Sequence, residues 1–172
     1  MLRRHLLGAL GACLLAAPAV AHVTLESREA PVGTGYKAVL RVPHGCDGTA
    51  TTAIRVRIPE GVVRAKPMPK PGWTLTTVTG KYAKTYELFH AKLNEGVTEI
   101  AWSGGNLPDA QYEEFVFQAN LADDLPAGKT IYFPVVQECE KGVHRWIEIP
   151  AEGKGPGDYA QPAPGLKLLP KR

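Results

Sequence analysis

The stretch Ile54-Arg55-Val56-Arg57-Ile58 alternates β-branched apolar residues with arginines, and this pattern decides the class of fold. A period of two is typical of a strand that buries one face in a core and leaves the other in water. An amphipathic helix would instead repeat its apolar residues every three or four positions. The segments Val39–Val42 and Glu114–Leu121 are also rich in the apolar residues that strands prefer. The chain is therefore predicted to be built from strands.

Further strand-like segments lie on both sides of this stretch. They are predicted at His22–Leu25, Thr74–Val78, Thr85–His90, Glu99–Trp102, Thr130–Val136 and Arg145–Ile149. The 18 glycines and 15 prolines are spread between them, as hairpin loops require. No stretch after residue 21 keeps a helical period. Short strands separated by turns predict an all-β fold, namely a two-sheet β-sandwich of immunoglobulin or fibronectin type.

Residues 1–21 have the pattern of a cleavable export signal. Two arginines precede an apolar run, and the small-residue sequence Ala19-Val20-Ala21 ends it. Cleavage there predicts a periplasmic protein that begins with His22. The mature chain is then expected to contain a domain at 22–150 and a Gly/Pro-rich C-terminal tail at 151–172.

A second interpretation of the same segment concerns Cys13. The sequence Leu10-Gly11-Ala12-Cys13 loosely resembles a lipoprotein cleavage box. Cutting there would make Cys13 a lipidation site and leave His22 inside the chain. The residues that follow Cys13 are apolar rather than a polar tether, which favours cleavage after Ala21.

Charge and hydropathy exclude two kinds of partner. The chain has 20 Lys and Arg against 17 Asp and Glu, and no basic stripe with interleaved aromatic residues, so no nucleic acid is expected. After residue 21 no apolar run approaches the roughly 18 to 20 residues that a transmembrane helix needs, so no membrane span is expected in the mature protein.

Two cysteines remain beyond the signal, Cys46 and Cys139. In an oxidising compartment the simplest prediction is a disulfide between them. The alternative is a pair of thiolate metal ligands. Copper-binding cysteine pairs usually lie close in sequence, and these two do not, so the disulfide is preferred.

An N-terminal histidine has a special metal chemistry. Its free α-amine and its near imidazole nitrogen can close a chelate ring on a divalent metal that prefers nitrogen, above all copper. A histidine inside a chain lacks the amine. In an extended segment His22 shares a face with Glu26, a candidate carboxylate ligand, and Glu29 is a second candidate after a bend. The plain alternative is that His22 only begins an edge strand.

The other histidines and the tryptophans give weaker indications of a metal site than His22 does. His44 lies in a turn two residues before Cys46, either as a surface residue or near the metal, whereas His90 and His144 are expected to be solvated. Trp73, Trp102 and Trp146 are expected in the core, with the alternative that Trp146 shields a metal. No Gly-x-Ser-x-Gly or His-Glu-x-x-His motif is present, so catalysis has no support from motifs.

Five segments in order resemble one family. They are His22–Leu25, Tyr36–Pro43, Pro71–Trp73, Glu113–Phe115 and Arg145–Glu148. Together they are similar to the YcnI-like copper-binding domain, a domain of bacterial exported proteins that was long without a known function. The resemblance extends from His22 to about Pro150.

The resemblance implies an immunoglobulin- or fibronectin-like sandwich with a single Cu(II) in a one-histidine brace. The amine and imidazole of His22 would form the brace, and Trp146 matches the tryptophan beside it. The family's glutamate ligand has no counterpart, because the chain has no acid between Glu29 and Asp47. Glu26, Glu29 or His44 are the candidates to replace it.

The leading hypothesis is a periplasmic protein that carries or buffers Cu(II) without catalytic turnover. The resemblance implies a partner, another periplasmic copper chaperone. One alternative is a copper enzyme similar to polysaccharide monooxygenases, which would need a second imidazole from His44, His90 or His144. The other is a metal-free extracytoplasmic binding module whose tryptophans line a groove.

Overall fold

The computed structural model describes residues 22–171. The predicted export signal, 1–21, lies outside the described residues, and so does the alternative lipidation site Cys13. Among residues 22–171 no helix is both long enough and apolar enough to cross a bilayer.

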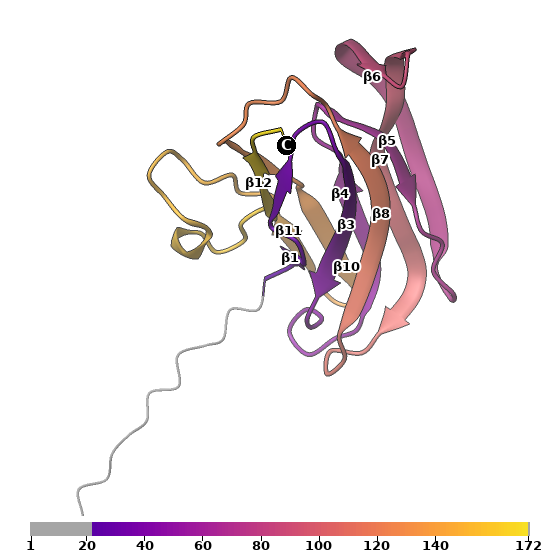
Figure 1. Ribbon diagram of the computed structural model, residues 1–172. Helices are drawn as coiled ribbons and strands as arrows, with labels where there is room; N and C mark the ends of the chain where they lie inside the picture. Colours follow the sequence, from indigo (N-terminus) through magenta and orange to yellow (C-terminus); the bar gives the residue numbers. More distant parts are fainter. Residues whose placement is uncertain (1–21, 172) are drawn as a thin grey trace, which may run out of the picture.

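Two sheets form the body of the molecule (Figure 1). The four-stranded sheet has the order β1 (Thr24–Leu25), β3 (Gly35–Val42), β8 (Glu113–Leu121) and β5 (Val62–Pro67). The five-stranded sheet has the order β11 (Val143–Trp146), β10 (Val135–Cys139), β4 (Thr51–Arg57), β7 (Ala91–Leu107) and β6 (Thr74–Leu88). The predicted all-β sandwich is confirmed.

The alternating stretch of β4 behaves as its pattern predicts. The side chains of Ile54 and Val56 are fully buried and that of Ile58 is nearly so, whereas Arg55 points away from the core. Arg55 forms ion pairs with two neighbouring strands, through Glu99 on β7 and Glu138 on β10. One face of the strand therefore packs in the core, and the other forms ion pairs with the neighbouring strands.

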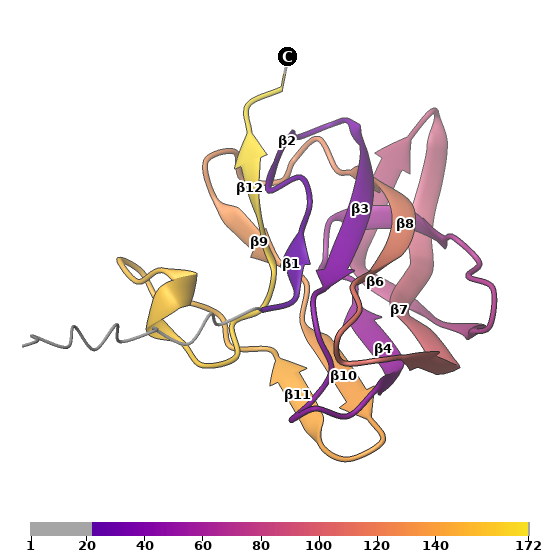
Figure 2. The same ribbon diagram turned by 90° about the horizontal axis from the view of Figure 1, so that it is seen from below.

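A third sheet of three strands closes one side of the sandwich (Figure 2). It consists of β2 (Glu29–Pro31), β12 (Gly165–Leu169) and β9 (Thr130–Tyr132). Leu166 and Leu168 of β12 are fully buried in the main core. The predicted domain boundary at residue 150 is therefore wrong, because the segment taken as a tail supplies a strand and two core side chains.

Two predicted strands differ from those observed, for identifiable reasons. The segment Thr130–Val136 is interrupted at Pro134, which has no N–H to donate to a ladder. Here the chain leaves the three-stranded sheet at the end of β9 and enters the five-stranded sheet at β10. The segment Arg145–Ile149 ends as a strand already at Trp146.

The segments predicted at Thr74–Val78, Thr85–His90 and Glu99–Trp102 belong to one long hairpin, β6–β7. His90 does not end a strand. It lies with Phe89 in the two-residue turn between β6 and β7, where both residues have positive φ, 49° and 63°. His90 is exposed there, as predicted.

Candidate functional site around His22 and Trp146

His22 stands directly before the first strand, and the core fixes which way it faces. Val23 and Leu25 are almost completely buried, so by alternation His22 and Thr24 face the other side. Thr24 pairs with Arg41 of β3, and this register continues toward Pro43. Because β1 is an edge strand, the half-buried His22 lies at the rim of the sandwich.

The imidazole of His22 contacts the indole of Trp146 across the gap between the two main sheets. The ring centroids are 5.4 Å apart with an angle of 70° between the planes, an edge-to-face arrangement. Trp146 ends β11, the edge strand of the five-stranded sheet, and is only 4% exposed. Nε2 of His22 is buried and has no hydrogen-bond partner among the described residues.

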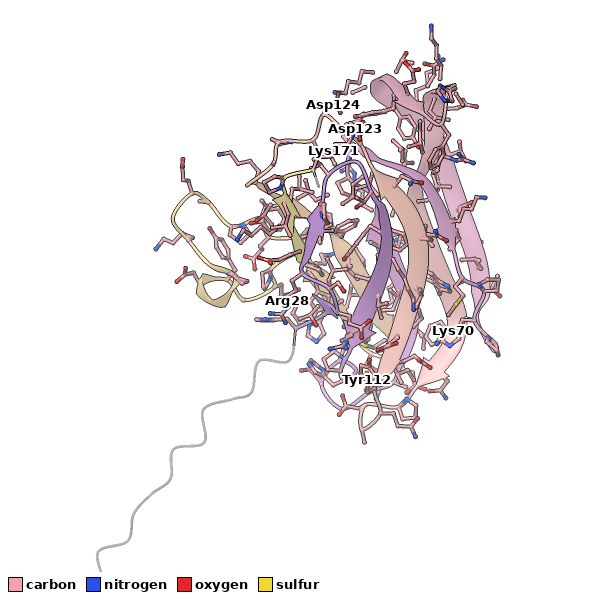
Figure 3. All side chains as sticks on the ribbon, viewed as in Figure 1. Arg28, Lys70, Tyr112, Asp123, Asp124 and Lys171 are labelled. Atoms are coloured by element: carbon pink, nitrogen blue, oxygen red, sulfur yellow. A yellow bond between two sulfur atoms is a disulfide. The ribbon has the colours of Figure 1, made fainter. Side chains whose placement is uncertain are left out.

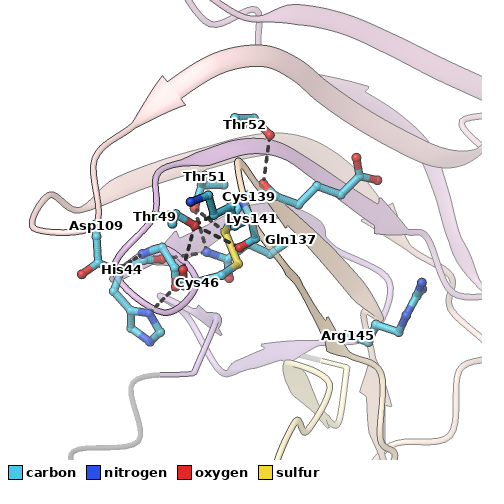
Figure 4. The surroundings of a disulfide bond; sticks show 12 residues. His44, Cys46, Thr49, Thr51, Thr52, Asp109, Gln137, Cys139, Lys141 and Arg145 are labelled. Atoms are coloured by element: carbon cyan, nitrogen blue, oxygen red, sulfur yellow. Dashed lines mark hydrogen bonds between the residues drawn. A yellow bond between two sulfur atoms is a disulfide. The ribbon is translucent and has the colours of Figure 1, made fainter.

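Trp146 is itself held by a buried glutamine that the sequence analysis did not single out. Trp146 Nε1 donates to Oε1 of Gln137 at 2.9 Å. Nε2 of Gln137 donates in turn to the carbonyl of His44 at 2.7 Å and to the hydroxyl of Thr51 at 2.8 Å. Gln137 is 1% exposed, and Figure 4 shows it beside the disulfide. This network fixes the indole against which His22 packs.

Replacing Gln137 by leucine tests this network. The Gln137→Leu change removes the bond to the His44 carbonyl and leaves Trp146 Nε1–H without its acceptor in a buried place. We expect the free energy of unfolding to fall by about 1–3 kcal/mol. Urea denaturation measures the loss, and Gln111→Leu on an exposed loop is the matched control. Equal midpoints for the two variants would contradict the structural role of Gln137.

Two further histidines, His44 and His144, belong to the same cluster of rings. The ring of His144 is 5.0 Å from that of Trp146, and His44 is 6.2 Å from His144, centroid to centroid. The expectation that His144 is merely solvated is wrong, because it is half-buried against the indole. Side chains alternate along a strand, so His144 and Trp146 lie on the same face of β11. The contact between them could therefore have been predicted from the sequence. Nδ1 of His44 donates to the Gly45 carbonyl at 2.6 Å, with the proton placed on that nitrogen.

The two predicted carboxylate ligands lie elsewhere. Glu26 forms an ion pair with Arg41 at 2.8 Å, and Glu29 pairs with Lys167 at 3.3 Å; both carboxylates are exposed. In an extended chain a residue four positions from His22 lies about 13 Å away along the strand. Within residues 22–171, no group of three or more His, Cys, Asp or Glu side chains is arranged to hold a metal.

The predicted disulfide between Cys46 and Cys139 is confirmed, with an S–S distance of 2.01 Å. It ties the turn after β3 to the end of β10, two residues from Gln137 (Figure 4). The alternative of a thiolate metal pair is therefore wrong for this structure.

A pocket of about 560 Å³ opens beside His22. It is lined by residues from the start of β1, from β9 and β12, and from the loop that contains the 3₁₀ turn η1 (Pro156–Asp158). The other lining residues are Val23, Thr24, Leu25, Arg28, Pro43, Thr130, Tyr132, Lys154, Pro156, Pro162, Ala163, Pro164, Gly165 and Lys167. Neither Glu26 nor Glu29 is among them.

These features define a class of protein: an immunoglobulin-like β-sandwich with a histidine, backed by a tryptophan, at the entry to its first strand. The chain belongs to the family described as Domain of unknown function (DUF1775), which matches residues 22–168. The match includes most of β12, in agreement with the corrected boundary. The predicted resemblance is thus confirmed at the level of the family.

The fold is shared with a solved structure, that of an uncharacterized protein from Nocardia farcinica described as having an immunoglobulin-like fold. The two chains are 27% identical, with a TM-score of 0.62, and the similarity covers 86% of this chain and 98% of the other. A comparison with curated proteins finds no match.

Proposed function

We propose that this protein binds Cu(II) in the periplasm through a one-histidine brace at His22, and that it carries or buffers the metal without catalytic turnover. The observation that supports the proposal most directly is the half-buried imidazole of His22. This ring packs edge-to-face on the buried indole of Trp146, so it is held at the entry to the first strand.

The chemistry of the donor set favours a brace. A proton on Nε2 leaves the lone pair of Nδ1, the nitrogen nearer the backbone, for a metal. Removal of residues 1–21 would free the α-amine of the same residue, and the two nitrogens would form one chelate. The described side chains contain no three-residue metal cluster, so the amine is the natural second ligand. Nitrogen donors of this kind suit Cu(II).

Trp146 would cover one side of the bound metal. Its indole is buried and fixed by Gln137, so it limits the access of water to the imidazole from that side. Such supporting side chains typically change metal affinity by about 10- to 100-fold when removed. His144 packs against the same indole and belongs to this supporting shell.

The position of the site favours transfer over catalysis. His22 lies at the end of the mature chain, on an edge strand, where a partner can approach the metal. The sequence contains no hydrolase or metalloprotease motif. The resemblance to the YcnI-like domain suggests that the partner is another periplasmic copper chaperone.

The pH dependence of copper binding tests the brace. A free α-amine has a reference pKa of about 7.7–8.0, so it is largely protonated at pH 6 and must lose that proton to bind. We therefore expect Cu(II) affinity to fall by about tenfold or more from pH 7 to pH 6. Quenching of tryptophan fluorescence during copper titration at each pH measures it. An affinity that does not change over this range would overturn the amine as a ligand.

A further inference from the structure

The pocket beside His22 is lined by more cationic side chains than are paired with carboxylates. Three of its lining side chains are cationic, Arg28, Lys154 and Lys167, and none is acidic. Lys167 is paired with Glu29 at 3.3 Å. Among the described residues, Arg28 and Lys154 have no carboxylate within ion-pair distance. Two uncompensated cations therefore line one pocket.

The two free cations reach the pocket from different parts of the chain. Arg28 follows β1, and Figure 3 shows it on the side of the molecule where the chain enters that strand. Lys154 comes from the loop before η1. Residues so far apart in sequence are brought to one pocket only by the fold, which distinguishes this arrangement from a solvated run of charge.

Part of the pocket lining is apolar. Pro156, Pro162 and Pro164 line the pocket with the buried side chains of Val23 and Ala163. A volume of about 560 Å³ lies within the range of small-molecule sites, roughly 300–1,000 Å³. A single water occupies only about 30 Å³ in the liquid. The pocket therefore suits an organic anion rather than a small inorganic one.

We infer that this pocket binds a small organic dicarboxylate, with one carboxylate on the guanidinium of Arg28 and the other on the ammonium of Lys154. The planar guanidinium can bind a carboxylate through two parallel hydrogen bonds, and the lysine contributes a point charge. Removal of residues 1–21 would add the charge of the free α-amine at the same pocket. His22 lines the pocket, so the anion lies next to the proposed copper ligand.

The test uses succinate and the metal-free protein that begins at His22. Isothermal titration at low ionic strength is expected to show one site. Arg28→Gln and Lys154→Gln should each weaken succinate binding by roughly tenfold or more, the scale of a hydrogen bond to a charged group. The matched controls are Arg57→Gln and Lys92→Gln, exposed cations outside the pocket. The β6–β7 hairpin that carries Lys92 lies on the opposite side of the molecule from β12 (Figures 1 and 2).

Two results would overturn the inference. One is a loss of succinate affinity that is equal in pocket variants and controls, which would indicate only general charge attraction. The other is inorganic phosphate binding as tightly as succinate, which would mean that the apolar walls contribute nothing. Since no copper is used, a failure of the copper proposal does not affect either result.

The consequence for copper rests on the proposed function. A carboxylate held beside His22 can complete the coordination that Glu26 and Glu29, paired elsewhere, do not supply. Succinate should then tighten copper binding, and copper should tighten succinate binding by the same factor. A copper paramagnetic resonance spectrum unchanged by saturating succinate would overturn this link and leave the dicarboxylate site standing.

Discussion

A protein that begins at His22 is expected to bind one Cu(II) tightly, and acetylation of its α-amine should weaken that binding by roughly 10²- to 10⁴-fold. The acetyl group converts the α-amine of His22 into an amide and leaves the imidazole in place. Titration followed by paramagnetic resonance measures both forms. We expect the hyperfine structure of an amine and an imidazole nitrogen only in the protein whose α-amine is free.

The size of the effect follows from chelation. Once the imidazole holds the metal, the amine of the same residue binds in an intramolecular step, with a high effective concentration. The acetylated protein has no free amine that could close this chelate with the imidazole of His22. Its copper is therefore expected to bind as a weaker complex.

A second pair of variants separates the imidazole from the amine. His22→Ala keeps a free α-amine and removes the ring that packs on Trp146, so it should lose copper binding at least as severely. His90→Ala removes an exposed imidazole in the β6–β7 turn and should change nothing. Equal affinities for the native and acetylated proteins would refute the brace, and the metal site would have to be sought at His44 and His144.

The fold could be predicted from sequence because its decisive strands are amphipathic. In β4, burial follows the alternation of Ile54 and Val56 with arginines, residue by residue. β12 escaped prediction because its apolar residues form only a short run, Leu166–Leu169, in a stretch rich in glycine and proline. Only pairing with β2 and β9, which are distant in sequence, makes that segment a strand.

The site was predictable only in part, because its parts come from both sheets. The contact between His22 and Trp146 agrees with their predicted proximity, which rested on the family resemblance. Alternation predicts Glu26 as a carboxylate ligand, and a bend after it allows Glu29. Neither argument can show that Arg41 and Lys167 pair with these two carboxylates. The support from Gln137 depends on strand pairing between β10 and β11, which a single sequence does not reveal.

Removal of the disulfide is expected to be the most damaging change to stability. A protein with both Cys46→Ser and Cys139→Ser should lose about 2–5 kcal/mol in the free energy of unfolding. For a chain of this length that corresponds to a fall of about 10 °C in Tm. Calorimetry of the oxidised protein and of the double variant measures it. The same loss should appear when the native protein is unfolded under reducing conditions.

The loop that the disulfide closes explains the size of this loss. The two cysteines are separated by 93 residues, and the chain-entropy model gives up to about 4.7 kcal/mol for a loop of this length. Thr49 offers a control in the same turn. Its hydroxyl donates to the Cys46 carbonyl at 2.8 Å, so Thr49→Ala should cost only about 1 kcal/mol. A double cysteine variant no less stable than Thr49→Ala would contradict the prediction.

Copper binding by the same variant separates a structural disulfide from a metal site. Neither cysteine is a ligand in the proposed brace, and both sulfurs are bonded to each other. Below its lowered Tm the double variant should therefore keep nearly native Cu(II) affinity.

The end of β10 that carries Cys139 also carries Gln137, which holds the indole of Trp146. A moderate loss of Cu(II) affinity would therefore be accompanied by greater mobility of that indole. Tryptophan fluorescence would report that change. Loss of all copper binding with an unchanged tryptophan spectrum would instead assign the metal to the sulfurs and overturn the role of His22.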